Sequence, residues 1–173
     1  AAFLLFVLPR IVSFFFLVNS TIKIAFLAAF IMGLLIHMPM MLGDIPNHDG
    51  LDSIYFDQNM ITSGRWFLTV ACGISSYFSL PWMISLLALF YLSLTSVALV
   101  EFLEIKKTAA IILISGLLVS FPAIASTFAY VFTMDGYMMA LLLAVLSVVL
   151  TKKYRFGFAA GAVCLACSMG TYQ

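Results

Sequence analysis

The chain has 173 residues, of which 65% are hydrophobic and 9% charged, and its formal net charge is +1. Soluble domains carry charge on about a quarter of their residues, so this composition excludes a soluble globular protein. The balanced charge and the lack of a basic run give no sign of nucleic-acid binding. We therefore predict an integral membrane protein.

The first 18 residues are apolar and long enough to cross a bilayer, but Pro9 and Arg10 interrupt them. They lack the basic start and the small-residue cleavage site of a signal peptide. An interfacial helix and an extra span both stay open. We favour the interfacial helix, because Lys23 then starts the next span from the cytoplasm.

Five apolar stretches follow and predict about five membrane spans. They run from Ile22 to Leu42, from Pro81 to Val100, from Thr108 to about Ser126, from Asp135 to Leu150 and from Phe156 to about Met169. Pro122 predicts a break or kink near the end of the third stretch. The expected fold class is all-α, a polytopic transmembrane helical bundle that forms one domain over residues 1–173. The chain lacks a starting Met and stops where a span should emerge, so we expect the N-terminal part of a longer protein.

Basic residues predict the orientation of the spans. Six of them fall on one side of the predicted membrane: Lys23, Lys106, Lys107, Lys152, Lys153 and Arg155. The other side holds one arginine and five aspartates: Arg65, Asp44, Asp49, Asp52, Asp57 and Asp135. The lysine-rich side is predicted to be cytoplasmic, in a multi-pass protein of a bacterial inner membrane.

The stretch from residue 43 to 80 is predicted to be a long extracytoplasmic loop, and such loops are often functional. Asp49 and Asp52 are three residues apart, so they share a face if this part is helical. A carboxylate at a membrane boundary is partly desolvated, which makes it a stronger base when ionised. We therefore take Asp49 and Asp52 as candidate catalytic bases, with Asp44 and Asp57 as binding candidates. Simple solvation of these loop carboxylates is the alternative.

Three further residues on the same side are candidate substrate ligands. The planar guanidinium of Arg65 suits a phosphate or a carboxylate, although an ion pair with a nearby aspartate is an alternative. Trp66 can stack on a sugar or lie in the interfacial aromatic belt. Asp135 opens the fourth stretch, where a carboxylate also stabilises the helix start. It faces the same side as the loop and can line the same cavity.

Other chemistries find little support. His37 and His48 have no metal-ligand spacing, and we assign no metal or cofactor. The pair Cys164 and Cys167 matches C-x-x-C, but it lies among small apolar residues typical of packed membrane helices. There is no P-loop, no G-x-S-x-G with a partner histidine and no H-E-x-x-H.

Four short segments resemble motifs of the Gtr-type glucosyltransferases, the bacterial and phage membrane enzymes of O-antigen serotype conversion. Asn47–Leu51 and Ser63–Trp66 resemble the motifs of their first outer loop. Phe132–Met139 resembles the segment around their later aspartate, and Gly170–Gln173 resembles their G-x-Y-Q. The resemblance runs from about Lys23 onward. His48 departs from it, because many members have an aspartate there.

The resemblance implies a GT-C-like fold and transfer of a hexose, expected to be glucose, from a polyprenyl-phosphate carrier such as undecaprenyl phosphate. The acceptor would be a lipid-linked glycan of the O-antigen (lipopolysaccharide) kind, and no metal or cofactor is implied. Asp49 or Asp52 would deprotonate the acceptor hydroxyl and Arg65 would meet the phosphate. The remaining binding candidates are Asp44, His48, Asp57, Trp66, Asp135, Tyr172 and Gln173.

Two other functions stay open. A transporter or flippase for a lipid-linked sugar would expect polar residues deep within the spans. Ser93, Thr95 and Ser96 are the only candidates, and side chains of this kind more often hold helices together. A non-catalytic membrane subunit would use the outer loop only to bind a partner.

Overall fold

The computed structural model describes residues 19–43, 64–72 and 80–171, and the regular elements within these ranges are all helical. The helices are α2 (Ser20–Leu42), α4 (Leu68–Ala71), α5 (Pro81–Phe102), α6 (Thr108–Ser120), α7 (Pro122–Thr127), α8 (Met134–Lys153) and α9 (Gly157–Thr171). The predicted all-α membrane fold is confirmed.

Three of the helices, α2, α5 and α8, are long and apolar enough to cross a membrane. The helices α6 and α9 are apolar but shorter, with 13 and 15 residues. All five begin within about two residues of their predicted starts, because the apolar runs that dictate them are bounded by polar residues or proline.

The third apolar stretch is broken as predicted. The helix α6 ends at Ser120, Phe121 is extended with ψ 131°, and Pro122 starts α7. Proline lacks a backbone N–H and disfavours a helical residue before it, so the chain changes direction there. The third stretch is therefore one 13-residue helix and a separate short helix, and it does not reach Ser126 as a single span.

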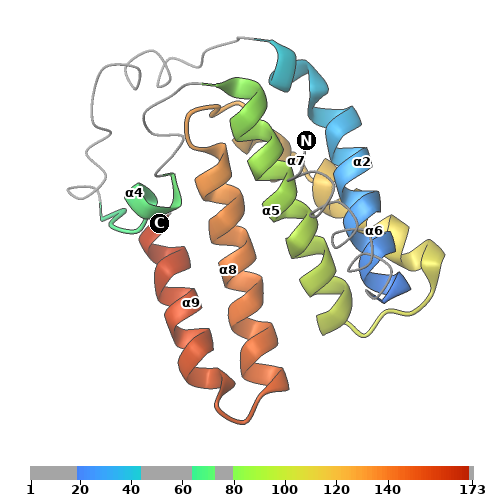
Figure 1. Cartoon of the computed structure of the whole chain (residues 1–173), viewed down its shortest axis with the longest axis vertical. Coiled ribbons are helices and arrows are strands. Elements are labelled where there is room, and N and C mark those ends of the chain that lie inside the picture. Colours follow the sequence, from blue (N-terminus) through green and yellow to red (C-terminus); the bar gives the residue numbers. More distant parts are fainter. Residues whose placement is uncertain (1–18, 44–63, 73–79, 172–173) are drawn as a thin grey trace, which may run out of the picture.

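The helices form a bundle in which neighbours in space follow the order α9, α8, α5, α2 and α6 (Figure 1). The short helix α4 lies against the start of α8 and the end of α9. Residues from α2, α5, α6, α7 and α8 share one hydrophobic core, which includes Ala29, Leu89, Val119, Phe128 and Met138. The outward faces carry large exposed apolar side chains, as lipid-facing helices do.

Small and hydroxyl-bearing residues join the helices inside this core. Gly33 of α2 faces Leu89 and Val119, so α2 comes close to both α5 and α6. The hydroxyls of Ser96 on α5 and Ser115 on α6 are 2.8 Å apart, and Ser115 also donates to the Ala25 carbonyl of α2 at 3.4 Å. Ser96 thus holds helices together as predicted, whereas Ser93 and Thr95, for which the same was predicted, donate to carbonyls of their own helix.

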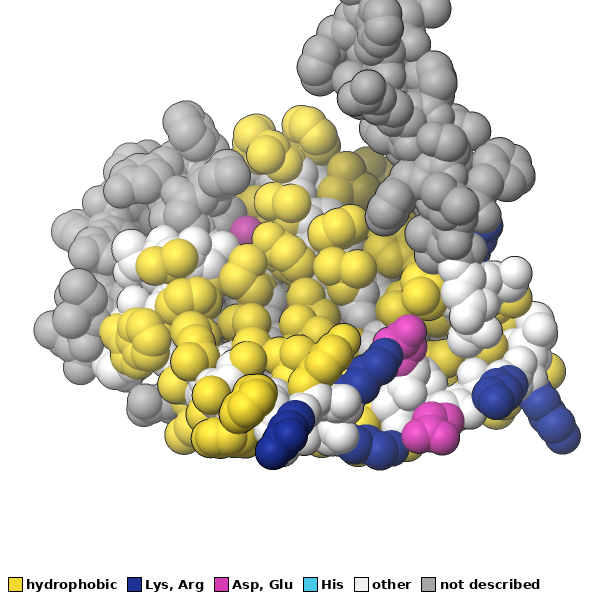
Figure 2. All heavy atoms as spheres, turned by 60° about the horizontal axis from the view of Figure 1, so that its bottom comes forward, with side chains coloured by type: hydrophobic (Ala, Val, Ile, Leu, Met, Phe, Trp, Pro, Cys, Tyr) yellow, Lys and Arg dark blue, Asp and Glu magenta, His cyan; other side chains and the backbone are white. Residues whose placement is uncertain are grey.

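Charged side chains gather at one end of the bundle, while hydrophobic side chains cover most of the rest of the described surface in this view (Figure 2). The start of α2, the α5–α6 turn and the end of α8 meet there and line one pocket with Thr21, Lys106, Lys152 and Lys153. The described basic residues other than Arg65 therefore share the end that the sequence assigned to them. We call this the lysine end, and the opposite one the Asp135 end.

Candidate functional site

The segment of Arg65, Trp66 and Phe67 is fixed to the last turn of α9 at the Asp135 end. The Phe67 N–H donates to the Gly170 carbonyl at 2.7 Å, across more than a hundred residues of sequence. Gly64 allows the chain to turn into this segment, since its φ of 81° is a conformation that favours glycine. Two motifs that are distant in sequence, Ser63–Trp66 and Gly170–Gln173, therefore meet through their described residues.

Trp66 lies directly against Gly170. A Cβ at position 170 would collide with the indole ring, so only glycine lets the two segments approach this closely. The indole is still 54% exposed. It therefore keeps a free face next to the site, which a sugar ring or a lipid headgroup can contact.

Asp135 is the buried carboxylate of this end, with only 2% of its surface exposed. It lies in the first turn of α8, where the positive end of the helix dipole favours a negative charge. Its Oδ1 accepts a hydrogen bond from the Gly136 N–H at 3.0 Å and one from the Cys72 thiol at 3.6 Å. The carboxylate is thus held in one orientation by the chain around it.

The residue after Asp135 explains how α4 reaches this carboxylate. A Cβ on Gly136 would meet the Cys72 sulfur and approach Leu68 Cδ1 to 2.9 Å, and Thr171 lies just beyond at 3.8 Å. The glycine therefore allows the segment that carries Cys72 to pack directly on the start of α8.

Thr133, two residues before Asp135 in the sequence, carries a further polar group. Its Oγ1 is buried and has no hydrogen-bond partner within the part of the chain that the structure describes. A buried hydroxyl without a partner is unfavourable and is typically kept for a reason. Together, Cys72, Thr133, Asp135, Gly136 and Thr171 form what we call the Asp135 cluster.

Three of the predicted site residues lie in the described ranges. Arg65 and Trp66 are on the segment that contacts α9, and Asp135 is at the start of α8, so all three are at the same end of the bundle. Arg65 is half-buried and has an interaction partner. The other predicted site residues lie outside the described residues: Asp44, His48, Asp49, Asp52, Asp57, Tyr172 and Gln173.

His37 is a packed residue, buried in the core. Its ring stacks on Phe128 with centroids 3.8 Å apart, and its Nε2 lies 3.0 Å from the Val119 carbonyl. Cys164 and Cys167 are half-buried free thiols on α9. No three His, Cys, Asp or Glu side chains come together as a metal-ligand group in residues 19–43, 64–72 and 80–171, and we assign no metal there.

The sequence pattern did not indicate the roles of Cys72 and Thr133. No local pattern marks them, because Cys72 bonds to Asp135 through tertiary packing and the Thr133 hydroxyl is notable only for its burial. The sequence shows only that a cysteine, Cys72, lies seven residues after Arg65, and this spacing indicates no specific partner.

Comparison with known proteins gives the family. The family model described as Glucosyl transferase GtrII matches residues 38–173, which include the Arg65–Phe67 segment, Asp135 and Gly170. Neither the curated proteins nor the solved structures that were compared with this chain match it. The match covers most of the chain, and the chain therefore belongs to the glucosyl transferase GtrII family.

Proposed function

We propose that the protein transfers glucose from a polyprenyl-phosphate carrier, such as undecaprenyl phosphate, to a lipid-linked glycan such as an O-antigen. Glucosyl transfer follows from the family. The observation that supports the remaining parts of the proposal is the position of Arg65, Trp66 and Asp135 at the same end of a membrane bundle. A donor anchored in the membrane brings its sugar to the level of such an end.

The orientation rests on the distribution of basic residues. Lys106, Lys152 and Lys153 lie together at the lysine end, and short basic loops stay in the cytoplasm. The Asp135 end then faces the periplasm or the exterior of a bacterial inner membrane. The glycan acceptor is met on that side.

The reaction needs a base, a leaving group and a fixed sugar. Asp49 or Asp52 takes the proton from the acceptor hydroxyl as its oxygen attacks the anomeric carbon. The bond from that carbon to the phosphate oxygen breaks, and polyprenyl phosphate leaves with the electron pair. Arg65 offsets the negative charge that develops on the phosphate. The products are the new glycoside and the carrier phosphate.

Asp135 is assigned to sugar binding. Its buried carboxylate is held by the Gly136 N–H and the Cys72 thiol, and a carboxylate has several lone-pair sites, so it can accept more than one hydrogen bond, including one from a sugar hydroxyl. Thr133, which has a buried hydroxyl, and Trp66, which has a free indole face, supply the further kinds of contact that a hexose uses. His48, Asp44, Asp57, Tyr172 and Gln173 are proposed as further substrate contacts.

The structure offers no support for transport as an alternative. Ser93 and Thr95 donate to the Leu89 and Tyr91 carbonyls of their own helix, and Ser96 bonds to Ser115. These described mid-span hydroxyls are occupied by contacts within the bundle. They do not form a row of free polar groups along a pathway.

The test uses the full-length protein in membranes with a radiolabelled polyprenyl-phosphate glucose and a lipid-linked glycan. Asp49→Asn and Asp52→Asn are compared with wild type at equal expression. We expect label transfer by wild type and its loss in the variant that lacks the base. Wild-type membranes that transfer no label from any such donor would overturn the proposal. If both variants transfer normally, neither aspartate is the base.

A further inference from the structure

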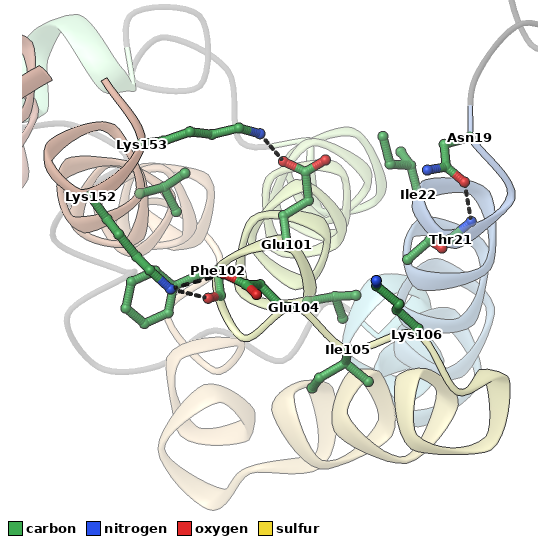
Figure 3. A pocket seen from close by; sticks show the side chains of 12 residues that line it. Asn19, Thr21, Ile22, Glu101, Phe102, Glu104, Ile105, Lys106, Lys152 and Lys153 are labelled. Atoms are coloured by element: carbon green, nitrogen blue, oxygen red, sulfur yellow. Dashed lines mark hydrogen bonds and ion pairs between the residues drawn. The ribbon is translucent and has the colours of Figure 1, made fainter. Parts of the chain in front are cut away.

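The pocket at the lysine end lies far from the site described above. It has a volume of about 420 Å³, within the range of small-ligand sites. The start of α2, the α5–α6 turn and the end of α8 form its walls, and Figure 3 shows their side chains around it. We propose that it holds the headgroup and upper acyl chain of an anionic phospholipid.

The lining is amphipathic in the way that such a lipid requires. The apolar part consists of Ile22, Val100, Phe102, Ile105 and Val149. The charged part consists of Lys106, Lys152, Lys153, Glu101 and Glu104, which sum to a charge of +1. A phosphate diester with an anionic headgroup suits the charged part, and the beginning of an acyl chain suits the apolar part.

The charged groups are arranged so that one ammonium group is available. Lys153 pairs with Glu101 at 3.2 Å and Lys152 pairs with Glu104 at 3.4 Å, between α8 and the end of α5 (Figure 3). Lys106 lies on the α2 side of the pocket and makes no ion pair with any residue that the structure describes. Its ammonium group is therefore the one that can bind a phosphate without breaking an existing pair.

The two ion pairs can also adapt to a ligand. Their lysine side chains are 54% and 56% exposed, so solvent already screens them. The Lys152 ammonium is in addition held by the Phe102 carbonyl at 3.1 Å. The N-terminal end of α2, with Thr21 and Ile22 in the pocket wall, adds the favourable end of a helix dipole.

The level of the pocket relative to the membrane favours a lipid over a soluble phosphate. The pocket lies where the membrane-crossing helices α2, α5 and α8 begin or end, which is the level of the lipid headgroups. Basic pockets between membrane helices bind anionic headgroups at this level. A lipid there would contact the start of α2, the end of α5 and the end of α8 together, whereas the two ion pairs join only α8 to the end of α5 and the turn that follows it.

The first test measures binding of phosphatidylglycerol to the purified full-length protein by native mass spectrometry. We expect Lys106→Gln to weaken binding about five-fold, the effect of one interfacial lysine. Lys107→Gln is the matched control, since Lys107 is adjacent but does not line the pocket, and it should leave binding unchanged. An equal loss in both variants would show a diffuse surface charge and overturn the site.

A second pair of variants tests the cavity without changing charge. Val149→Phe fills the pocket and should weaken phosphatidylglycerol binding, while Val148→Phe should not, because Val148 faces outward and is 50% exposed. Equal binding by both variants contradicts the proposal.

Two ligand competitions identify the source of the phosphate. Phosphatidylcholine should bind more weakly than phosphatidylglycerol, because its quaternary ammonium meets a net positive lining. Glycerol 3-phosphate should not displace the lipid. Displacement by this soluble phosphate, or equal binding of both lipids, would overturn the anionic-phospholipid assignment.

Discussion

The two ends of the bundle handle charge in opposite ways. At the Asp135 end one carboxylate is almost fully buried and is bonded to a thiol and a backbone N–H. At the lysine end two ion pairs lie in the open, with side chains 38–75% exposed. Buried polar groups depend on their exact partners, whereas exposed pairs contribute little and are replaceable. The difference marks the Asp135 end as the part of the molecule whose geometry is fixed.

The largest effect is expected from Gly136→Ala. A Cβ at position 136 would collide with Cys72 and crowd Leu68. This clash would push α4 away from α8 and disturb Asp135. We expect a destabilisation of about 3 kcal/mol, as for severe overpacking, together with loss of transfer. Thermal unfolding in detergent checks the stability.

Gly116→Ala is the control, because its new Cβ would meet only the flexible end of Met32, at 3.2 Å. It should change stability by less than about 1 kcal/mol. Similar melting of both variants would contradict the close packing at Gly136.

A smaller effect is expected from His37→Ala, which removes a ring stacked on Phe128 and a bond to the Val119 carbonyl. The loss should be about 2 kcal/mol, from one aromatic contact and one buried hydrogen bond. Chemical denaturation of the purified protein measures it. His37→Phe keeps the stack alone and should recover part of the loss; no recovery would show that stacking is unimportant.

Next comes Cys72→Ala, which removes the thiol donor to Asp135 Oδ1. A thiol is a weak donor, so we expect about 1 kcal/mol or less in stability. The KM for the donor should rise and lower the rate of glucose transfer, because Asp135 is held less firmly in one orientation. Cys72→Ser, which keeps a donor, should restore KM. A KM that stays at the wild-type value in Cys72→Ala would count against this role.

The smallest effect is expected at the lysine end. Lys153→Gln breaks the exposed pair with Glu101 and should change stability by at most about 0.5 kcal/mol. The melting temperature and the transfer rate should both stay near wild type. A loss of stability as large as that of His37→Ala would contradict the view that the exposed ion pairs at the lysine end are replaceable.

The sequence predicted the helices well because each is a continuous apolar run with clear limits. Leu42, Pro81 and Thr108 mark helix boundaries that hold in the structure, and Pro122 breaks the chain as expected. The third stretch is the exception: it was predicted to run to about Ser126, but α6 already ends at Ser120, two residues before Pro122.

Only part of the candidate site could be predicted from the sequence. Arg65, Trp66 and Asp135 were placed on one side by counting spans and charges, and the structure brings them to the same end. The contact of Trp66 with Gly170 and the bond from Cys72 to Asp135 join residues far apart in sequence. Such contacts depend on how whole helices pack, and no local spacing encodes them.

The most direct test of the account compares Asp135→Asn with Glu104→Gln in the radiolabelled glucose transfer assay, at equal amounts of folded full-length protein. Each variant removes one negative charge with little change in size, one at each end of the bundle. We predict that Asp135→Asn lowers transfer about 10- to 100-fold, the effect of losing a hydrogen bond to a charged group, and that Glu104→Gln leaves it unchanged. Normal transfer by Asp135→Asn, or an equal loss in both variants, would contradict the assignment of the site to the Asp135 end.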